Sequence, residues 1–254
     1  MTRKLLLALA IVAVAALCVR LGFWQLSRWH GKQRLNAALR SALASPPLDL
    51  SPPLPALESV RLRRVRANGV YDERRQFVLS ARAHQGSPGV DVVTPLVIAP
   101  GQAVLVDRGW LYAADASTAN PLAHPVPGPR AVVGLPQALP PVRGPWPLHR
   151  LPYSDSASVW ATLGLDPDTL AARLPYRVAP WMLRALPGPD APSEPLRSAP
   201  EPFDEMMHLS YAIQWFTFAT ILVVGSLAVT IARSRGAPGA ATIVPPPPRP
   251  GDSP

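Results

Sequence analysis

The stretch LSYAIQWFTFATILVVGSLAVTIA, residues 209–232, decides the fold, because it contains neither a charged residue nor a proline. A second apolar stretch, LLLALAIVAVAALCVRLGFWQL at residues 5–26, contains one charged residue, Arg20. At the α-helical rise per residue, residues 5–26 would extend roughly 33 Å, enough to cross a hydrocarbon core of about 30 Å. The sequence therefore predicts two transmembrane helices, at residues 1–27 and 207–232.

The placement of proline and charge restricts the rest of the chain. None of the 34 prolines precedes Pro46 and none lies between Pro202 and Pro238, whereas the remainder of the 254 residues is rich in them. The single Cys18 excludes a disulfide framework and a Cys-x-x-Cys metal or redox site. The net charge of +9 comes from scattered arginines rather than a basic block, so we expect no nucleic-acid partner.

The charges beside the second span set the expected topology. Glu201 and Asp204 precede it, and Arg233 and Arg235 follow it, so its C-terminal end is expected in the cytoplasm. The basic residues after the first span would alone place the N-terminus outside, but charge counts lose weight across loops much longer than about 60 residues. Two spans then place both termini in the cytoplasm and a large domain on the extracytoplasmic side.

The N-terminus has an alternative interpretation as a cleaved signal peptide, with Ala13-Val14-Ala15 as the cleavage site. Cleavage there would leave an apolar core of only about eight residues, at the short edge of the normal range, so we favour an uncleaved anchor. The short Arg-Lys start does not resemble a transit peptide, which favours a bacterial plasma (inner) membrane.

The region between the spans is predicted to be a mostly antiparallel β domain. Residues 28–55 are expected to form a stalk that is helical to about Ala44 and then a Pro-rich linker. The domain is expected at 56–186, followed by a second linker at 187–206, and residues 233–254 are expected to form a disordered cytoplasmic tail. The alternation of apolar and polar residues shifts by one position at Arg63-Arg64, which predicts a β-bulge there. Asp166 as N-cap, followed by Pro167, predicts the start of one helix. Short alternating runs predict strands at 60–70, 76–81, 90–98, 103–107, 131–135 and 176–183. The expected fold class is an α+β membrane protein in which a transmembrane hairpin flanks this domain.

No nucleophile elbow, phosphate-binding loop, dinucleotide fingerprint or His-Glu-x-x-His motif is present in the sequence. The closest approach to a catalytic cluster is His149 with Ser154, Asp155 and Ser156, in a Pro-rich region that more often forms a solvated loop. We therefore expect no catalytic residues, and a membrane-tethered hydrolase is the least favoured function.

The informative residues lie at the outer ends of the two spans. His208, Tyr211 and Trp215 share roughly one face of the second helix, while Trp24, Gln25 and Arg28 occupy the equivalent end of the first, at a similar depth. Polar groups at this depth face a neighbouring helix or a ligand more often than lipid. These residues could form an ordinary interfacial aromatic belt with a snorkelling arginine. They could instead bind haem, with an axial histidine, aromatic walls and an arginine beside a propionate. Residue types alone leave both interpretations open.

Motifs spread over most of the chain resemble the Surfeit-locus-one family of cytochrome c oxidase assembly proteins. Each motif is weak alone, but their order and placement relative to the two spans are specific. They comprise Gly22, Trp24, Gln25, Leu26, Arg28 and Lys32; Val65, Gly69, Tyr71 and Asp72; Pro88-Gly89, Val92-Val93-Thr94-Pro95-Leu96 and Val106-Asp107-Arg108-Gly109-Trp110; and His208-Leu209, Tyr211-Ala212 and Gln214-Trp215-Phe216.

This resemblance implies an integral membrane assembly factor, without catalysis, that helps haem a reach the catalytic subunit of the oxidase. It implies His208 as the haem-iron ligand, and oxidase subunits, haem a synthase and membrane lipid as partners. Met207 stands where the family often has Asn, which removes an amide beside the proposed ligand. Arg108 and Trp110 suit a partner-facing corner, or equally a salt bridge with a stacked tryptophan. The alternative function is a cofactor-free, membrane-anchored scaffold that docks on oxidase subunits.

Overall fold

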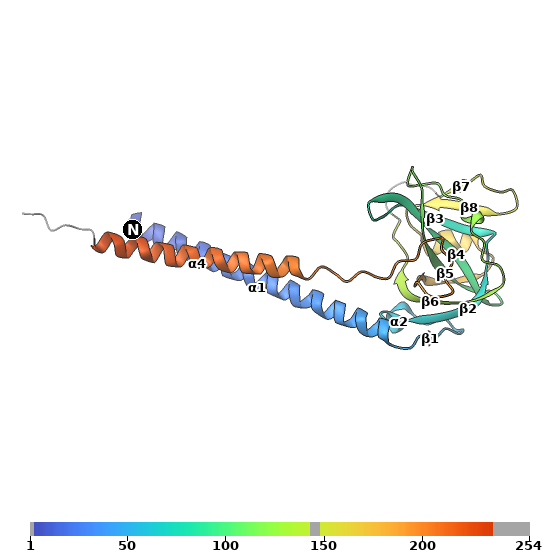
Figure 1. Ribbon diagram of the computed structural model, residues 1–254, viewed down its shortest axis with the longest axis horizontal. Coiled ribbons are helices and arrows are strands. Elements are labelled where there is room, and N and C mark those ends of the chain that lie inside the picture. The colour runs from blue at the N-terminus through green and yellow to red at the C-terminus, as the bar shows by residue number, and fades with distance from the viewer. Residues whose placement is uncertain (1–2, 143–147, 236–254) are drawn as a thin grey trace, which may run out of the picture. The chain divides into compact units, whose positions relative to one another are not determined.

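The computed structural model describes residues 3–142 and 148–235, which fall into two compact units (Figure 1). A helical unit is built from the two ends of the chain, up to Leu35 and from Phe203 onward, and a β unit spans Asn36–Pro202. The expected tail at 233–254 lies outside the described residues from position 236 onward.

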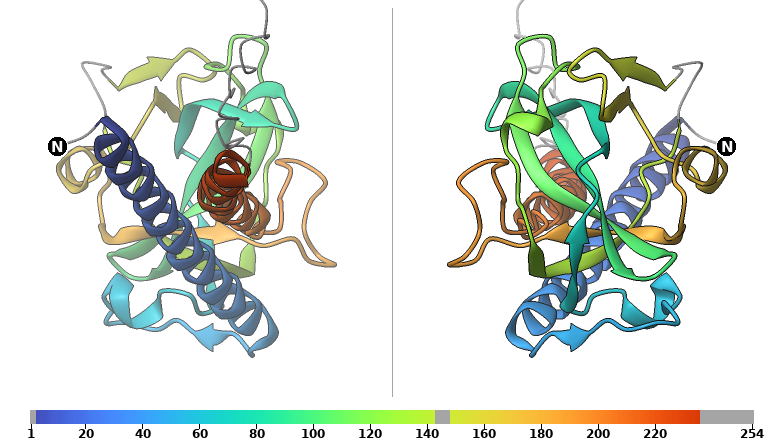
Figure 2. Two further views of the ribbon diagram at one scale, coloured as in Figure 1. Left: turned by 90° about the vertical axis from the view of Figure 1, so that its left-hand side faces the viewer. Right: turned by 90° about the vertical axis from the view of Figure 1, so that its right-hand side faces the viewer.

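The helical unit consists of α1 (Arg3–Ala44), whose last residues belong to the β unit, and α4 (Met206–Arg235). Both helices are long and apolar enough to cross a membrane. They lie against each other (Figure 2), and the rings of Phe23 and Phe216 meet edge to face with centroids 5.3 Å apart. The prediction that the chain stays helical to about Ala44 is confirmed, because α1 continues unbroken to that residue, just before the first prolines of the chain.

The β unit is organised around five strands that close into a ring in the order β2-β6-β9-β5-β4, with β4 pairing again with β2. Three further strands, β3, β8 and β7, extend the sheet outward from β4. Most pairings are antiparallel, as predicted; the parallel pairs are β1–β2, β3–β8 and β5–β9. The strands are β1 (Leu48–Asp49), β2 (Val65–Tyr71), β3 (Arg75–His84), β4 (Ser87–Ala99), β5 (Gln102–Tyr112), β6 (Pro129–Ala138), β7 (His149–Leu151), β8 (Ser158–Thr162) and β9 (Arg177–Ala185).

Short helical segments cover this sheet. They are α2 (Leu57–Val60), the 3₁₀ helix η1 (Pro121–Ala123) and α3 (Pro167–Arg173). The start predicted for α3 is confirmed, since Asp166 Oδ1 accepts a hydrogen bond from Thr169 N at 2.9 Å. Trp181 fills the ring interior with no exposed surface, and its Nε1 donates to Pro55 O at 2.9 Å. The ring is therefore a packed core rather than a channel.

Two sequence expectations differ from the structure. The β-bulge expected at Arg63-Arg64 is wrong: α2 ends at Val60 and β2 begins at Val65, so the slipped alternation marks a change from helix to strand. The compact unit is also wider than the expected 56–186. Leu48 pairs with Val65 at one end of the unit, and Leu196 forms an antiparallel bridge with Trp110 at the other.

Candidate functional site

The central feature of the helical unit is a hydrogen bond between its two helices. His208 Nδ1 on α4 lies 2.8 Å from Gln25 Oε1 on α1, and the pair is half-buried. Because an amide oxygen only accepts, this hydrogen bond requires a proton on Nδ1. In the tautomer with its one proton on Nδ1, the other nitrogen, Nε2, carries the lone pair and is the atom that could bind a metal.

The sequence around each residue explains this placement. Asp204 Oδ1 accepts hydrogen bonds from the backbone nitrogens of Met206 at 2.9 Å and Met207 at 3.3 Å, which fixes the start of α4. His208 therefore sits in the first helical turn. Deeper along the helices, a Cβ on Gly22 would lie 2.7 Å from the Phe216 ring, so the absence of a side chain sets how closely the helices approach.

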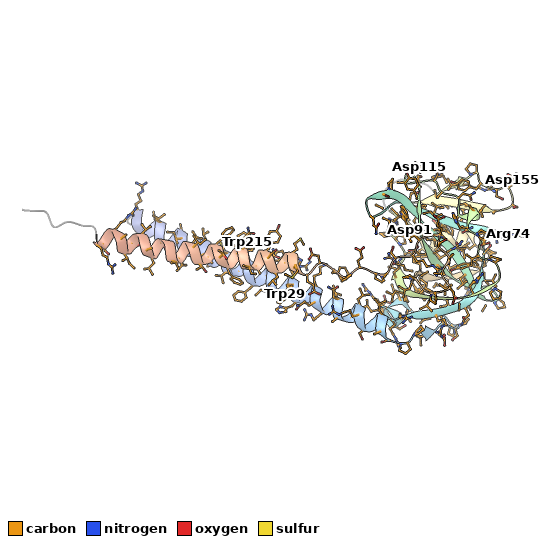
Figure 3. The ribbon with its side chains drawn as sticks, in the orientation of Figure 1. Trp29, Arg74, Asp91, Asp115, Asp155 and Trp215 are labelled. Carbon is orange, nitrogen blue, oxygen red and sulfur yellow. The ribbon has the colours of Figure 1, made fainter. Side chains whose placement is uncertain are left out.

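The other predicted site residues of this unit lie on the same two helices as His208 and Gln25. Trp24 and Tyr211 are 54% and 47% exposed, and Arg28 is exposed as well. Trp215, on α4 in Figure 3, packs edge to face on Phe218 at a centroid distance of 5.9 Å. The predicted site thus consists of largely exposed aromatic and basic side chains on the two helices that the His208–Gln25 hydrogen bond joins.

Two contacts of this unit were not predicted. Gln25 was expected at the depth of His208, as a polar group that faces a neighbouring helix or a ligand, but its hydrogen bond to His208 itself was not predicted. Lys32 Nζ lies 4.4 Å from the ring centroid of Phe203, so a cation–π contact connects α1 to the segment that precedes α4. The structure thus gives His208 an amide partner even though residue 207 is Met.

Arg108 does not lie at a surface corner, which was one of the two positions that we considered equally; as the other interpretation requires, it has an acidic neighbour, with Nη1 3.9 Å from Glu73 Oε1. Its side chain has no exposed surface; Nη1 lies 3.4 Å from Gln76 Oε1 and Nη2 donates to His124 O. The guanidinium also lies 5.3 Å from the Tyr71 ring centroid. Burial lowers the pKa of this guanidinium, and the nearby Tyr71 opposes that shift. Arg108 therefore holds the domain interior together and offers no surface to a partner in this structure.

Trp110 lies where the linker returns to the sheet. Its backbone N donates to Leu196 O at 2.9 Å and its O accepts from Leu196 N at 2.8 Å. Gly109, with φ +126°, makes this approach possible, because a Cβ there would lie 2.5 Å from Leu196 O. The indole of Trp110 packs against Gly89: a Cβ added at that position would lie 2.3 Å from Nε1. These motif residues therefore dock the linker on β5, and a partner role for Trp110 stays a prediction.

The cluster around His149 does not form a nucleophile and base. Ser154 Oγ accepts hydrogen bonds from the backbone nitrogens of Ser156 at 3.1 Å and Ala157 at 3.2 Å, as in a tight turn. Within the described part of the chain, no hydrogen bond joins His149 to Ser154, Asp155 or Ser156. The geometry gives no support to hydrolysis at this place.

Comparison with known proteins places these features in a family. A model of the SURF1 family matches residues 12–220, which include Gln25, His208 and the whole β unit. The chain belongs to the SURF1 family. Membership of the SURF1 family implies a role in cytochrome c oxidase assembly and, with two helices suited to spanning, indicates a membrane protein.

Relatives in the SURF1 family come from bacteria and eukaryotes. An uncharacterised SURF1-like protein of Mycobacterium tuberculosis (strain H37Rv) is 30% identical over 230 residues, covering 87% of this chain and 81% of that protein. Surfeit locus protein 1 of Arabidopsis thaliana is 33% identical over 114 residues, covering 38% of this chain and 31% of that protein. A SURF1-like protein of Dictyostelium discoideum is 29% identical over 99 residues.

Proposed function

We propose that this chain assists the delivery of haem a to the catalytic subunit of cytochrome c oxidase, holding it transiently through Nε2 of His208. The observation that carries this proposal is the hydrogen bond between His208 Nδ1 and Gln25 Oε1. Histidines that bind metals usually donate their other ring N–H to an oxygen, which fixes the tautomer and the ring orientation. Gln25 supplies that oxygen from the neighbouring helix.

The surroundings of His208 suit a carrier of an amphipathic planar group. Haem would supply an iron that can bind an imidazole nitrogen. Trp24 and Tyr211 offer exposed rings on the two helices that carry Gln25 and His208, and Arg28 offers a guanidinium for a propionate. Few contacts hold such a ligand on an open surface, so it can be passed on.

The proposed site requires a defined membrane arrangement. We place both termini in the cytoplasm and the β unit outside, because acidic residues precede α4 and Arg233 and Arg235 end it. His208 then lies near the outer face of a bacterial plasma membrane. Cysteine labelling with a membrane-impermeant maleimide tests this: Ser154→Cys should react in intact spheroplasts, and Ser234→Cys only after lysis.

Haem content decides the carrier function. The full chain, purified in detergent from a haem-replete host, should show a Soret band, and His208→Ala should lose most of it. His149→Ala, in β7 of the other unit, is the matched control and should retain wild-type occupancy. Equal occupancy in wild type and His208→Ala would remove His208 from the site. A wild type without a Soret band would leave the cofactor-free scaffold as the function.

The proposed partners are tested separately. Affinity capture of the full chain from membranes should enrich oxidase subunits and haem a synthase. If His208→Ala loses haem and still captures the oxidase, docking and haem binding are separate properties of the chain. If no oxidase subunit is captured by wild type after cross-linking, the partner assignment is wrong.

A further inference from the structure

A cavity of about 370 Å³ lies in the β unit, where strands β3, β4, β5, β6 and β9 meet residues 196–198 of the linker. Its wall combines a few apolar side chains with a group of charged ones. The charged residues are Arg82, Asp91, Asp107, Arg184 and Arg197. All of the residues that line it belong to the β unit.

Asp107 is the most enclosed of these charged residues. Its side chain is 6% exposed, and Oδ1 accepts a hydrogen bond from Gly109 N at 3.1 Å. The strand register places Arg184 of β9 directly beside Asp107 of β5. Among the described residues, however, no cation lies within 4.0 Å of the Asp107 carboxyl, so the register neighbours do not form an ion pair.

The other carboxyl of the wall is already paired. Asp91, labelled in Figure 3, forms an ion pair with Arg82, in which Oδ2 of Asp91 lies 3.2 Å from Nε of Arg82. Three guanidinium groups therefore face two carboxyls, which gives the wall a formal charge of +1 with every group ionised (3 − 2) and +2 with Asp107 protonated. An anion is attracted to such a wall, and a cation is repelled.

Trp110 also lines the cavity, but its Nε1 does not face it: the nitrogen is buried, and a Cβ on Gly89 would lie 2.3 Å from it. The donors available to a ligand are therefore the guanidinium groups of the wall. An oxyanion supplies acceptors for the guanidinium of Arg184.

We propose that this cavity is a binding site for a small oxyanion, a carboxylate or a sulfate-like group, held by Arg184 with Asp107 as a neutral hydrogen-bond donor. The volume lies in the range of small-molecule sites. An ionised Asp107 would repel the same ligand, so the carboxyl controls access by its proton. The inference does not depend on haem binding.

The proton on Asp107 makes binding depend on pH. Burial raises the pKa of Asp107 to about 7, the negative charge of Asp91 adds to the rise, and Arg184 opposes it. Between pH 6 and pH 8 the protonated fraction falls from about 0.9 to about 0.1, so apparent affinity should fall roughly tenfold. The titratable and charged groups that line the cavity around Asp107 are Asp91 from β4, Arg82 and His84 from β3, Arg184 from β9 and Arg197 from the linker; β6 contributes the uncharged Gln137.

The test uses the full chain in detergent with sodium sulfate and sodium acetate as separate probes, because both keep a constant charge above pH 6. Sodium chloride holds the ionic strength constant. Binding is followed by the ¹⁵N-indole signal of Trp110, assigned by Trp110→Phe. We expect a saturable shift at pH 6 with at least one probe, and roughly tenfold weaker binding at pH 8. A response to one probe alone identifies the class of oxyanion.

Three variants complete the experiment. Asp107→Asn keeps the size of the side chain without the charge, so its affinity should be the same at both pH values. Arg184→Gln should weaken binding at least tenfold at pH 6, and Asp115→Asn, at an exposed carboxyl outside the cavity, should change nothing. The proposal is overturned if neither probe gives a saturable shift at pH 6 or if Arg184→Gln binds like wild type. Saturable binding with no pH dependence in wild type would overturn the role of Asp107.

Discussion

Replacing Asp107 by Asn should change how the stability of the domain depends on pH, independently of any ligand. Burial is the main cause that raises the pKa of Asp107 from 3.8 to about 7 in the folded protein. Between these values the folded state binds a proton that the unfolded state has lost. The contribution of Asp107 to stability is therefore complete below pH 3.8 and is lost as pH rises through 7.

The size of the effect follows from the difference between the two pKa values. Each pKa unit corresponds to about 1.4 kcal/mol, so a rise of about three units corresponds to about 4 kcal/mol in total. About 2–3 kcal/mol of this is lost between pH 5 and pH 8, which for a domain of this size lowers Tm by about 5–10 °C. Asp107→Asn should not show this part of the pH dependence, because its amide does not titrate and still accepts from Gly109 N.

Thermal unfolding followed by circular dichroism, at half-unit steps from pH 5 to pH 8, measures the difference between the two proteins. Asp115→Asn is the control. Hydrogen bonds from Thr118 and Ser117 lower the pKa of Asp115 to about 2, so its titration lies below this pH range. Parallel Tm profiles for wild type and Asp107→Asn would refute the burial of an uncompensated carboxyl at this place.

Three further substitutions test the packing. Gly22→Leu should separate α1 from α4, because a Cβ at residue 22 would lie 2.7 Å from the Phe216 ring. The separation should be seen as a loss of cross-linking between cysteines introduced on the two helices. Gly225→Leu is the control and should leave cross-linking unchanged, because nothing lies within 4 Å of its Cβ position. Gly89→Ala should destabilise the domain by about 1–3 kcal/mol in urea unfolding, because its Cβ would meet a backbone carbonyl oxygen at 2.3 Å; an unchanged midpoint would contradict this close approach. Asp166→Ala should lower the free energy of unfolding by about 1 kcal/mol, because it removes the acceptor of the hydrogen bond from Thr169 N. Asp168→Ala is the control, and an equal loss in that variant would show that helix capping is not the cause.

The elements that the sequence predicted best are those set by local patterns. Two proline-free windows predicted α1 and α4, and an N-cap followed by proline predicted α3 at Pro167–Arg173. The closure of the ring could not be predicted, because it depends on the short pairing of Val70 and Tyr71 with β4. Strand β8 was also missed: its register with β3 is parallel and joins segments far apart in sequence.

The candidate site was predicted in its residue types and not in its contacts. The similar depth of His208 and Gln25 followed from the hairpin topology, but their hydrogen bond depends on how the two helices are rotated about their axes, which the sequence alone does not determine. The burial of Arg108 was not predicted, because strand-end arginines are usually exposed, and its burial depends on partners from distant segments, among them Gln76 and the carbonyl of His124.

The docking of Leu196 on Trp110 has a practical consequence for work with the isolated β unit. A recombinant fragment cut after β9, near residue 186, would leave the backbone of Trp110 without its partner and expose one side of the β5 ribbon. Open strand edges pair with other chains, so such a fragment should aggregate during expression. A cut at residue 200 or later retains the segment that covers this edge and should yield a monodisperse domain.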